Sequence, residues 1–138
     1  MAIRLIISDF DRTFTDETLK VDAGLADAIR RLKAMDVSFS IVSGRNYSFL
    51  FDLYNELDGL FDSFVAENGC VGFFNGKKYV LGGSADRAVL FKRLDLLSVP
   101  YGYGEVIVAV DRAYEAGLMK ALTEIGNSFD VIKNVDSL

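Results

Sequence analysis

Two aspartates separated by one residue follow an apolar stretch near the N-terminus. Residues 3–8 (IRLIIS) lead into DFDRTFTD, which contains Asp9, Asp11 and two threonines. Two carboxylates this close repel each other unless a positive charge lies between them. Carboxylates also act as nucleophiles and as general acids or bases. The segment is therefore a candidate for cation binding, for carboxylate catalysis, or for both.

Three interpretations of this segment compete. A calcium loop of the EF-hand type needs glycine at its sixth position and glutamate at its twelfth. Those positions hold Phe14 and Lys20, so this loop is excluded. A structural role, in which Asp and Thr serve as turn and helix-cap residues, remains open. The third interpretation is a nucleophile beside an acid–base group.

The composition limits the chemistry that is available. Of the 138 residues, 51% are hydrophobic and 25% are charged, as in an ordinary globular domain. Histidine is absent, which excludes Ser-His, Cys-His and histidine–metal mechanisms. The single cysteine, Cys70, can form no disulfide within the chain, and we expect it to be buried as a small hydrophobe. Any acid–base chemistry must come from carboxylates.

Charge and hydropathy limit the classes of binding partner that we expect. The formal net charge is −5, and the basic residues form no stripe, so we expect no nucleic-acid binding. The apolar runs are too short to span a bilayer, and the N-terminus does not resemble a secretory signal. We therefore expect no membrane association and a cytoplasmic location.

Hydrophobic spacing predicts alternating strands and helices in the first half of the chain. It predicts strands at residues 3–8, 37–42 and 64–66, with helices over residues 25–35 and 49–57. This order favours an α/β fold of the Rossmann-like type, with a parallel sheet and helices on both faces. Ligands of such sheets bind at the carboxyl ends of the strands. The polar segments that follow the three strands are expected to meet there.

The second half has a different pattern. Residues 71–74 and 78–81 flank Asn75-Gly76 and predict a hairpin. Beyond it we expect a helix over residues 84–97, a loop after Pro100, a strand over 105–110, a helix over 112–125 and a strand over 129–133.

Three segments resemble motifs of one enzyme superfamily. Asp9–Thr13 resembles motif I of the haloacid dehalogenase-like (HAD) phosphatases, Asp-x-Asp-x-Thr/Val directly after the first strand. Ile41–Arg45 resembles the second motif of the branch with C2-type caps, and Glu67–Gly69 resembles the Glu-Asn-Gly of that branch. The chain is thus similar to Cof-type and archaeal phosphoglycolate phosphatase-like enzymes. Arg12 is a departure, because most members have glycine there.

The resemblance implies a Mg²⁺-dependent phosphatase, a phosphoric monoester hydrolase of small phosphorylated metabolites. It implies that Asp9 is the nucleophile, which forms an aspartyl-phosphate, and that Asp11 is the general acid and base. Asp9 and Asp11 are also the implied ligands of Mg²⁺. The implied phosphate- or substrate-binding residues are Thr13, Ser43, Gly44, Arg45 and Asn68.

Two elements of the family's site are not found. These are a lysine that steadies the nucleophile and a Gly-Asp-x-x-x-Asp segment that completes the metal shell; Lys120 is better explained as a solvated residue. We expect residues 1–79 to form the N-terminal portion of a HAD-like core and residues 80–138 to form a C2-type cap. The chain is then a truncated or reduced member, or one piece of a longer or split protein, completed by a homo-oligomer or by a missing C-terminal segment.

The pattern bears on two other classes of function. A response-regulator receiver has adjacent acids after its first strand and an aspartate at the end of its third, where this chain has Glu67. That class is disfavoured. A catalytically inactive HAD-like interaction or regulatory domain remains the alternative to an active enzyme.

Overall fold

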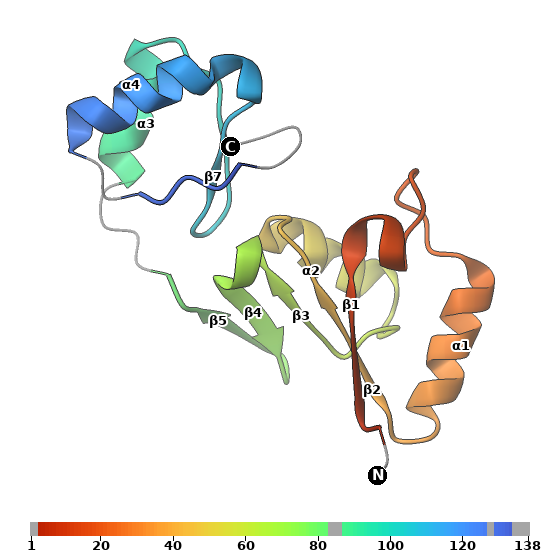
Figure 1. Cartoon of the computed structure of the whole chain (residues 1–138). Coiled ribbons are helices and arrows are strands. Elements are labelled where there is room, and N and C mark those ends of the chain that lie inside the picture. The colour runs from red at the N-terminus through yellow and green to blue at the C-terminus, as the bar shows by residue number, and fades with distance from the viewer. Residues whose placement is uncertain (1–2, 83–86, 127–128, 134–138) are drawn as a thin grey trace. The chain divides into compact units, whose positions relative to one another are not determined.

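The computed structural model describes residues 3–82, 87–126 and 129–133. The chain divides into two compact units, Met1–Gly82 and Gly83–Leu138 (Figure 1). The predicted boundary after residue 79 falls inside the last strand of the first unit, just before this division. The assignment of the two units to core and cap stays a prediction.

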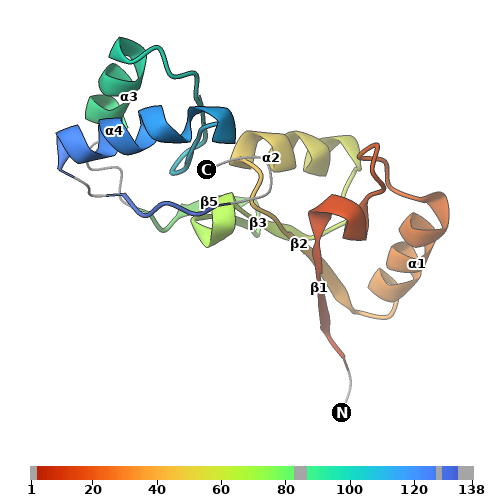
Figure 2. The same cartoon turned by 45° about the horizontal axis from the view of Figure 1, so that its top comes forward.

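The first unit contains a five-stranded sheet in the order β1-β2-β3-β4-β5 (Figure 2). Its strands are β1 (Leu5–Asp9), β2 (Ser38–Val42), β3 (Ser63–Ala66), β4 (Val71–Phe74) and β5 (Lys77–Val80). The first three strands are parallel, while β4 and β5 are antiparallel. Asn75 and Gly76 join β4 to β5 with φ of 49° and 71°, the positive values that a tight hairpin turn requires. The predicted strands of this unit and its hairpin are confirmed.

Two helices connect the parallel strands. Helix α1 (Ala23–Lys33) begins after Asp22, whose side chain accepts the N–H of Leu25 at 3.1 Å. Helix α2 (Tyr47–Glu56) begins after Asn46, whose side chain accepts the N–H of Phe49 at 2.9 Å. Such caps satisfy amide groups that the helix itself leaves unpaired. Because both helices link neighbouring parallel strands by right-handed crossovers, they cover the same face of the sheet.

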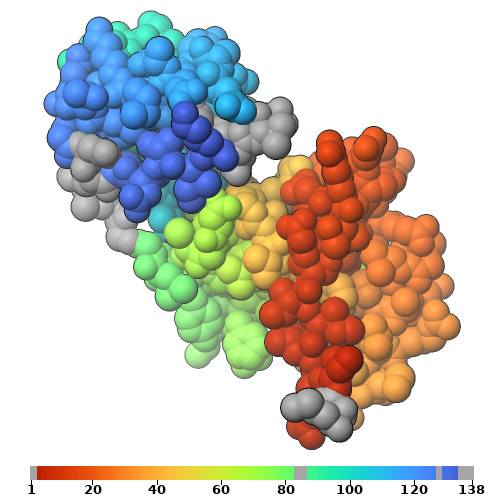
Figure 3. Space-filling model, viewed as in Figure 1, coloured from red at the N-terminus to blue at the C-terminus, as the bar shows by residue number. Residues whose placement is uncertain are grey.

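Side-chain burial distinguishes the two faces of the sheet. Phe39, Ile41 and Phe64 point to the helical face and are at most 5% exposed. On the other face, Leu5 and Ile7 pair with Ser38 and Ser40 and are 51% and 58% exposed. Figure 3 shows the N-terminal strand at the surface of the first unit. The α/β class is confirmed, and within residues 3–82 the helices lie on one face.

Aromatic side chains fill the helical face. Tyr54 lies 5.5 Å from Phe61 and 5.0 Å from Phe73, measured between ring centroids. Phe64 stacks on Phe73 at 5.3 Å, and Phe14 meets Phe61 edge-on at 6.0 Å. Aromatic pairs in these geometries add to the stabilisation that burial alone provides. Phe74 differs from these aromatic side chains, because it is 55% exposed.

The second unit is a small α/β assembly. Helices α3 (Arg87–Leu96) and α4 (Glu115–Ile125) accompany a two-stranded antiparallel ribbon of β6 (Gly102–Tyr103) and β7 (Val108–Ala109). Its core consists of Leu90, Leu94, Val99, Val110, Leu118, Ala121 and Leu122. A 3₁₀ turn at Arg112–Tyr114 precedes α4, so the predicted helix over residues 112–125 is confirmed with a tighter first turn. Every helix in the described segments is too short or too polar to cross a membrane.

Four details of the sequence prediction are wrong. The strand expected over residues 105–110 is reduced to β7, because Gly104 donates to the Ile107 carbonyl at 3.0 Å and closes a turn. Its partner β6 lies in the segment that we predicted to be a loop, and residues 129–133 form no strand because β6 and β7 pair with each other. Cys70 is half-buried instead of buried. The first residues of the helix predicted over 84–97 lie outside the described part of the chain.

Replacing Phe64 with Ala should lower the free energy of unfolding by about 3–5 kcal/mol, the usual cost of deleting a buried aromatic ring. Phe64 is 1% exposed, whereas Phe74 is 55% exposed. Phe74→Ala is therefore the matched control, with an expected change of about 0.5 kcal/mol or less. Urea titration of both variants measures the difference, and equal losses would contradict the described core.

Candidate active site

Three loops at the carboxyl edge of the parallel strands form the candidate site. The register aligns Asp9 of β1 with Val42 of β2, and Val42 with Val65 of β3, so the strands end side by side. The second and third loops are joined through the backbone, since Glu67 N–H donates to the Arg45 carbonyl at 2.9 Å. The structure therefore brings all three predicted motifs to one edge of the sheet.

The loop after β1 is a single irregular turn over Phe10–Phe14. Phe10 and Phe14 are at most 1% exposed and anchor the turn to the core. The N–H and the hydroxyl of Thr15 both donate to the Phe10 carbonyl, at 3.1 and 3.2 Å. Arg12 has a φ of 59°, in the left-handed region. Glycine adopts this conformation freely, whereas another residue pays about 1–2 kcal/mol, which explains physically why glycine suits this position.

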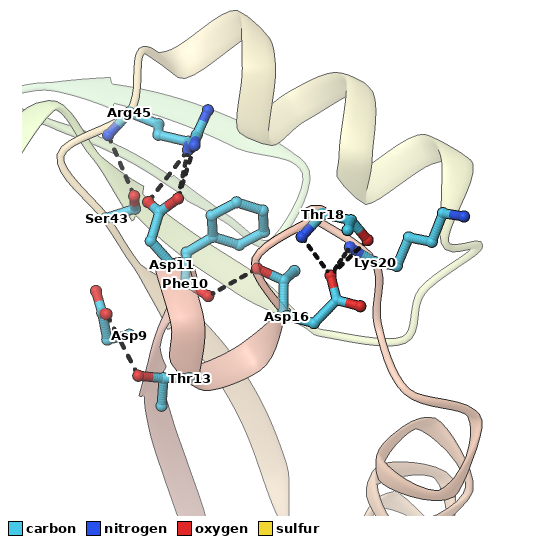
Figure 4. Close-up of polar contacts among 10 residues, drawn as sticks. Asp9, Phe10, Asp11, Thr13, Asp16, Thr18, Lys20, Ser43 and Arg45 are labelled. Atoms are coloured by element: carbon cyan, nitrogen blue, oxygen red, sulfur yellow. Dashed lines mark hydrogen bonds and ion pairs between the residues drawn. The ribbon is translucent and has the colours of Figure 1, made fainter.

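Asp11 is held by Arg45 from the second loop (Figure 4). Arg45 Nε lies 3.1 Å from each Asp11 carboxylate oxygen, and Nη2 lies 2.7 Å from Oδ1. The guanidinium carbon lies 4.6 Å from the ring centroid of Phe49 and 5.5 Å from that of Phe10. Ring faces attract a cation, so the two phenylalanines help to orient Arg45. The ion pair fixes the first loop to the second.

Figure 4 draws a contact between Asp9 and Thr13, whereas the contacts of Asp11 run to Arg45. The Thr13 hydroxyl lies 3.5 Å from Asp9 Oδ2, the limit of a hydrogen bond. Both side chains are exposed. The two aspartates of motif I therefore have different surroundings, since one is open to solvent and the other is paired with a guanidinium.

Ser43, Gly44 and Asn68 form the wall opposite the first loop. Ser43 is 5% exposed, and its hydroxyl accepts the N–H of Arg45 at 3.2 Å. A Cβ added to Gly44 would lie 2.8 Å from the side-chain oxygen of Asn68, closer than ordinary packing allows. Glycine at position 44 therefore permits Asn68 to lie against the second loop. Of the seven residues predicted for the site, Asp9 ends β1 and the other six lie on the three loops.

Glu67 is a residue of the site that the sequence interpretation missed. Its side chain is 0% exposed, and its Oε1 accepts the N–H of Tyr47 at 3.0 Å. The signal was present in the Glu-Asn-Gly segment, from which only Asn68 was assigned a role. A carboxylate next to a predicted strand end is rarely buried without a partner.

Asp16 orders the loop that leads to α1. Its Oδ1 accepts hydrogen bonds from the Thr18 hydroxyl and N–H, both at 2.7 Å, and from the Lys20 N–H at 3.0 Å. The bond from the Thr18 side chain, followed by that from the Lys20 backbone, holds the pKa of Asp16 below its ordinary value of 3.8. These bonds shape the exit of the first loop.

The donors of the site suit a hard cation. Asp9 and Asp11 provide carboxylate and carbonyl oxygens, the ligands that Mg²⁺ prefers, and Mg²⁺ commonly keeps several waters beside one or two carboxylates. In the described ranges, no three Asp, Glu, Cys or His side chains are grouped so that they could hold a metal ion. A pair of aspartates with water is thus the donor set that these residues offer.

Comparison with known proteins identifies the family that the chain resembles. The family described as haloacid dehalogenase-like hydrolase matches residues 6–99. A phosphoglycolate phosphatase of Metallosphaera sedula is 37% identical over 90 residues, which cover 64% of this chain and 40% of that protein. Phosphoglycolate phosphatase 1 of Saccharolobus solfataricus is 40% identical over 79 residues, or 54% of this chain and 33% of that protein.

A solved structure has the same fold. A protein of Thermoplasma acidophilum superposes with a TM-score of 0.71 at 18% identity, covering 99% of this chain and 64% of that protein. The chain matches less than half of the length of the two curated relatives. Together these similarities confirm the predicted HAD resemblance and its phosphoglycolate phosphatase-like branch.

Proposed function

The chain belongs to the haloacid dehalogenase-like hydrolase family, and on this premise we propose that its first unit holds the N-terminal part of a phosphatase site. The substrates are small phosphorylated metabolites, and phosphoglycolate is the first to test because two relatives are named for it. One observation supports the proposal above all. The loop of Asp9 and Asp11 meets the loop of Ser43–Arg45 at the carboxyl edge of the sheet, joined by the Arg45–Asp11 pair.

The reaction proceeds in two displacements. In the first, a carboxylate oxygen of Asp9 bonds to phosphorus, the ester P–O bond breaks, and Asp11 gives its proton to the departing alkoxide. In the second, Asp11 takes a proton from water, and the water oxygen bonds to phosphorus. The aspartyl-phosphate then breaks to release inorganic phosphate and the free Asp9 carboxylate.

The second loop binds the phosphate. The Ser43 hydroxyl and the Gly44 N–H donate to phosphate oxygens, with the Asn68 amide beside them. Arg45 is a bidentate partner for oxyanions, so the substrate phosphate competes with Asp11 for the guanidinium. Loss of the Arg45–Asp11 pair on binding frees Asp11 to exchange a proton with the leaving oxygen.

Asp9 and Asp11 are the residues that would hold Mg²⁺, Asp9 through its carboxylate and Asp11 through its backbone. The ion supplies positive charge that offsets the repulsion between the Asp9 carboxylate and the substrate phosphate. Thr13 lies beside Asp9 and orients its second oxygen.

The second unit is proposed to be a C2-type cap. It has two helices and a short antiparallel ribbon around its own apolar core, a composition that fits a small α/β insertion. A cytoplasmic location remains part of the same proposal.

Asp9→Asn should lower kcat for Mg²⁺-dependent hydrolysis of p-nitrophenyl phosphate by a factor of about 10³ or more, because it removes the nucleophile. Asp27→Asn is the control, since Asp27 is an exposed carboxylate on α1 that pairs with Arg30 at the surface. The control variant should leave turnover unchanged. Excess EDTA should abolish turnover in the wild type and in the control variant. Equal activity of Asp9→Asn and the wild type would refute the assignment.

A catalytically inactive interaction or regulatory domain is the second candidate function. It is favoured by the donor set of the described residues, in which no three Asp, Glu, Cys or His side chains are grouped around a metal position. A folded wild type that binds phosphate without hydrolysing any phosphate ester would support it.

Self-association at β1 is proposed as the way in which the sheet is completed. Leu5 and Ile7 of this edge strand are 51% and 58% exposed, and Ile3, which precedes the strand, is 72% exposed. The opposite edge strand, β5, begins with two lysines that discourage pairing. A C-terminal segment of a longer or a partner chain is the other proposed occupant of the β1 edge.

Sedimentation velocity tests this association on the 138-residue chain. We expect a dimer or larger species for the wild type and a shift to monomer for Ile7→Lys, because a charge on the edge opposes strand pairing. Leu96→Lys is the control, since Leu96 is 74% exposed in the second unit and should leave the distribution unchanged. A clean wild-type monomer would sink the self-association proposal.

A further inference from the structure

Glu67 contacts the backbone at two points where the Ser43–Arg45 loop leads into α2. Its N–H donates to the Arg45 carbonyl at 2.9 Å, and its Oε1 accepts the N–H of Tyr47 at 3.0 Å. Between these two contacts lies Asn46, the cap of α2. The single residue Glu67 therefore fixes the backbone over the whole passage from the second loop into the helix.

Glu67 supplies an acceptor at the start of α2. The side chain is 0% exposed, and its Oε1 accepts the N–H of Tyr47, the first residue of a ten-residue helix. The first amide groups of a helix have no acceptor within the helix, so side chains commonly supply one. Truncation of Glu67 would remove this acceptor from the part-buried Tyr47 N–H.

The backbone at Glu67 and Asn68 is strained. Both residues have a φ of 55°, a backbone angle that residues other than glycine rarely adopt. Such conformations persist where the surroundings enforce them, and they cluster at functional sites. Here the strain brings the Asn68 oxygen to within 2.8 Å of the position a Cβ on Gly44 would occupy.

The fixed loop in turn determines where Arg45 lies. With its carbonyl held by Glu67, Arg45 directs its guanidinium to Asp11, with Nη2 at 2.7 Å from Oδ1. A shift of the loop by an ångström would separate these groups and move the Ser43 hydroxyl with them. Small displacements of positioned groups are costly in catalysis.

We propose that Glu67 is a positioning residue, which sets the Ser43–Arg45 loop for phosphate and aligns Arg45 with Asp11. The inference rests on the proposed phosphatase function. It adds a buried carboxylate that touches neither substrate nor metal and acts through the loop it holds.

The test compares three replacements with one control. Glu67→Ala removes the acceptor, Glu67→Asp withdraws it by one methylene, and Glu67→Gln keeps an oxygen at the same reach. Asp62→Ala is the control, because Asp62 Oδ2 likewise accepts a backbone N–H, that of Phe39 at 2.9 Å, at the opposite end of the sheet. The readouts are the ¹⁵N resonances of Arg45 Nε and Gly44 N, assigned with Arg45→Lys, and the KM for p-nitrophenyl phosphate.

We expect Glu67→Ala and Glu67→Asp to shift or broaden the Arg45 Nε resonance and to raise KM about tenfold, an effect of the size that misplaced positioning groups produce. Glu67→Gln should stay within about threefold of the wild type, since it preserves the hydrogen bond. Asp62→Ala should lower the melting temperature without altering Arg45 or KM. If Glu67→Ala does not fold, the Arg45 Nε resonance and the KM of Glu67→Asp test the proposal instead.

An Arg45 resonance that is unchanged in the folded Glu67 variants would overturn the inference, as would an equal change in Asp62→Ala. The resonance does not depend on turnover. A wild type without hydrolysis therefore refutes the phosphatase proposal, while the Arg45 signal still decides the role of Glu67.

Discussion

The ion pair between Arg45 and Asp11 is the interaction on which the geometry of the candidate site depends. It joins the loops after β1 and β2, and each partner is held from behind: Asp11 by the anchored turn Phe10–Phe14, and Arg45 by Phe49 and the backbone contact to Glu67. The two side chains are 34% and 45% exposed, so the pair contributes only about 0–1 kcal/mol to stability. In the proposed function, a phosphate dianion therefore displaces Asp11 at little cost, so the same contact can order the two loops and give up Arg45 to a substrate.

The two faces of the sheet differ in what covers them. The helical face packs aromatic rings closely enough to fix the strand ends, and hence the loops, in one arrangement. The other face leaves Leu5 and Ile7 in contact with solvent. Parallel sheets are normally covered on both faces, so this face and the β1 edge are where further polypeptide would add the greatest stability. Asp9 lies at the end of that same strand, so whatever pairs with β1 would also approach the proposed nucleophile.

Much of this arrangement could be predicted from the sequence because it depends on local patterns. The strands at residues 5–9, 38–42 and 63–66 are short apolar runs, and the parallel order follows from the intervening helices. The spacing of the motifs predicted that Asp11 and Ser43 lie at the same edge of the sheet. The pairing of Arg45 with Asp11 and the buried role of Glu67 depend on contacts between loops far apart in the chain, which spacing does not encode. The strand expected over residues 129–133 failed for a related reason, since alternating apolar residues make a strand only where a neighbour offers its backbone.

A crystal structure of the chain with Mg²⁺ and orthovanadate would test the central claim most directly. Vanadate imitates the five-coordinate geometry that phosphorus adopts during phosphoryl transfer. The account predicts vanadium in line with an Asp9 carboxylate oxygen, with the Ser43 hydroxyl and Gly44 N–H within hydrogen-bond distance and Arg45 drawn away from Asp11. Vanadate bound elsewhere, or an unchanged Arg45–Asp11 pair at saturating vanadate, would contradict the account.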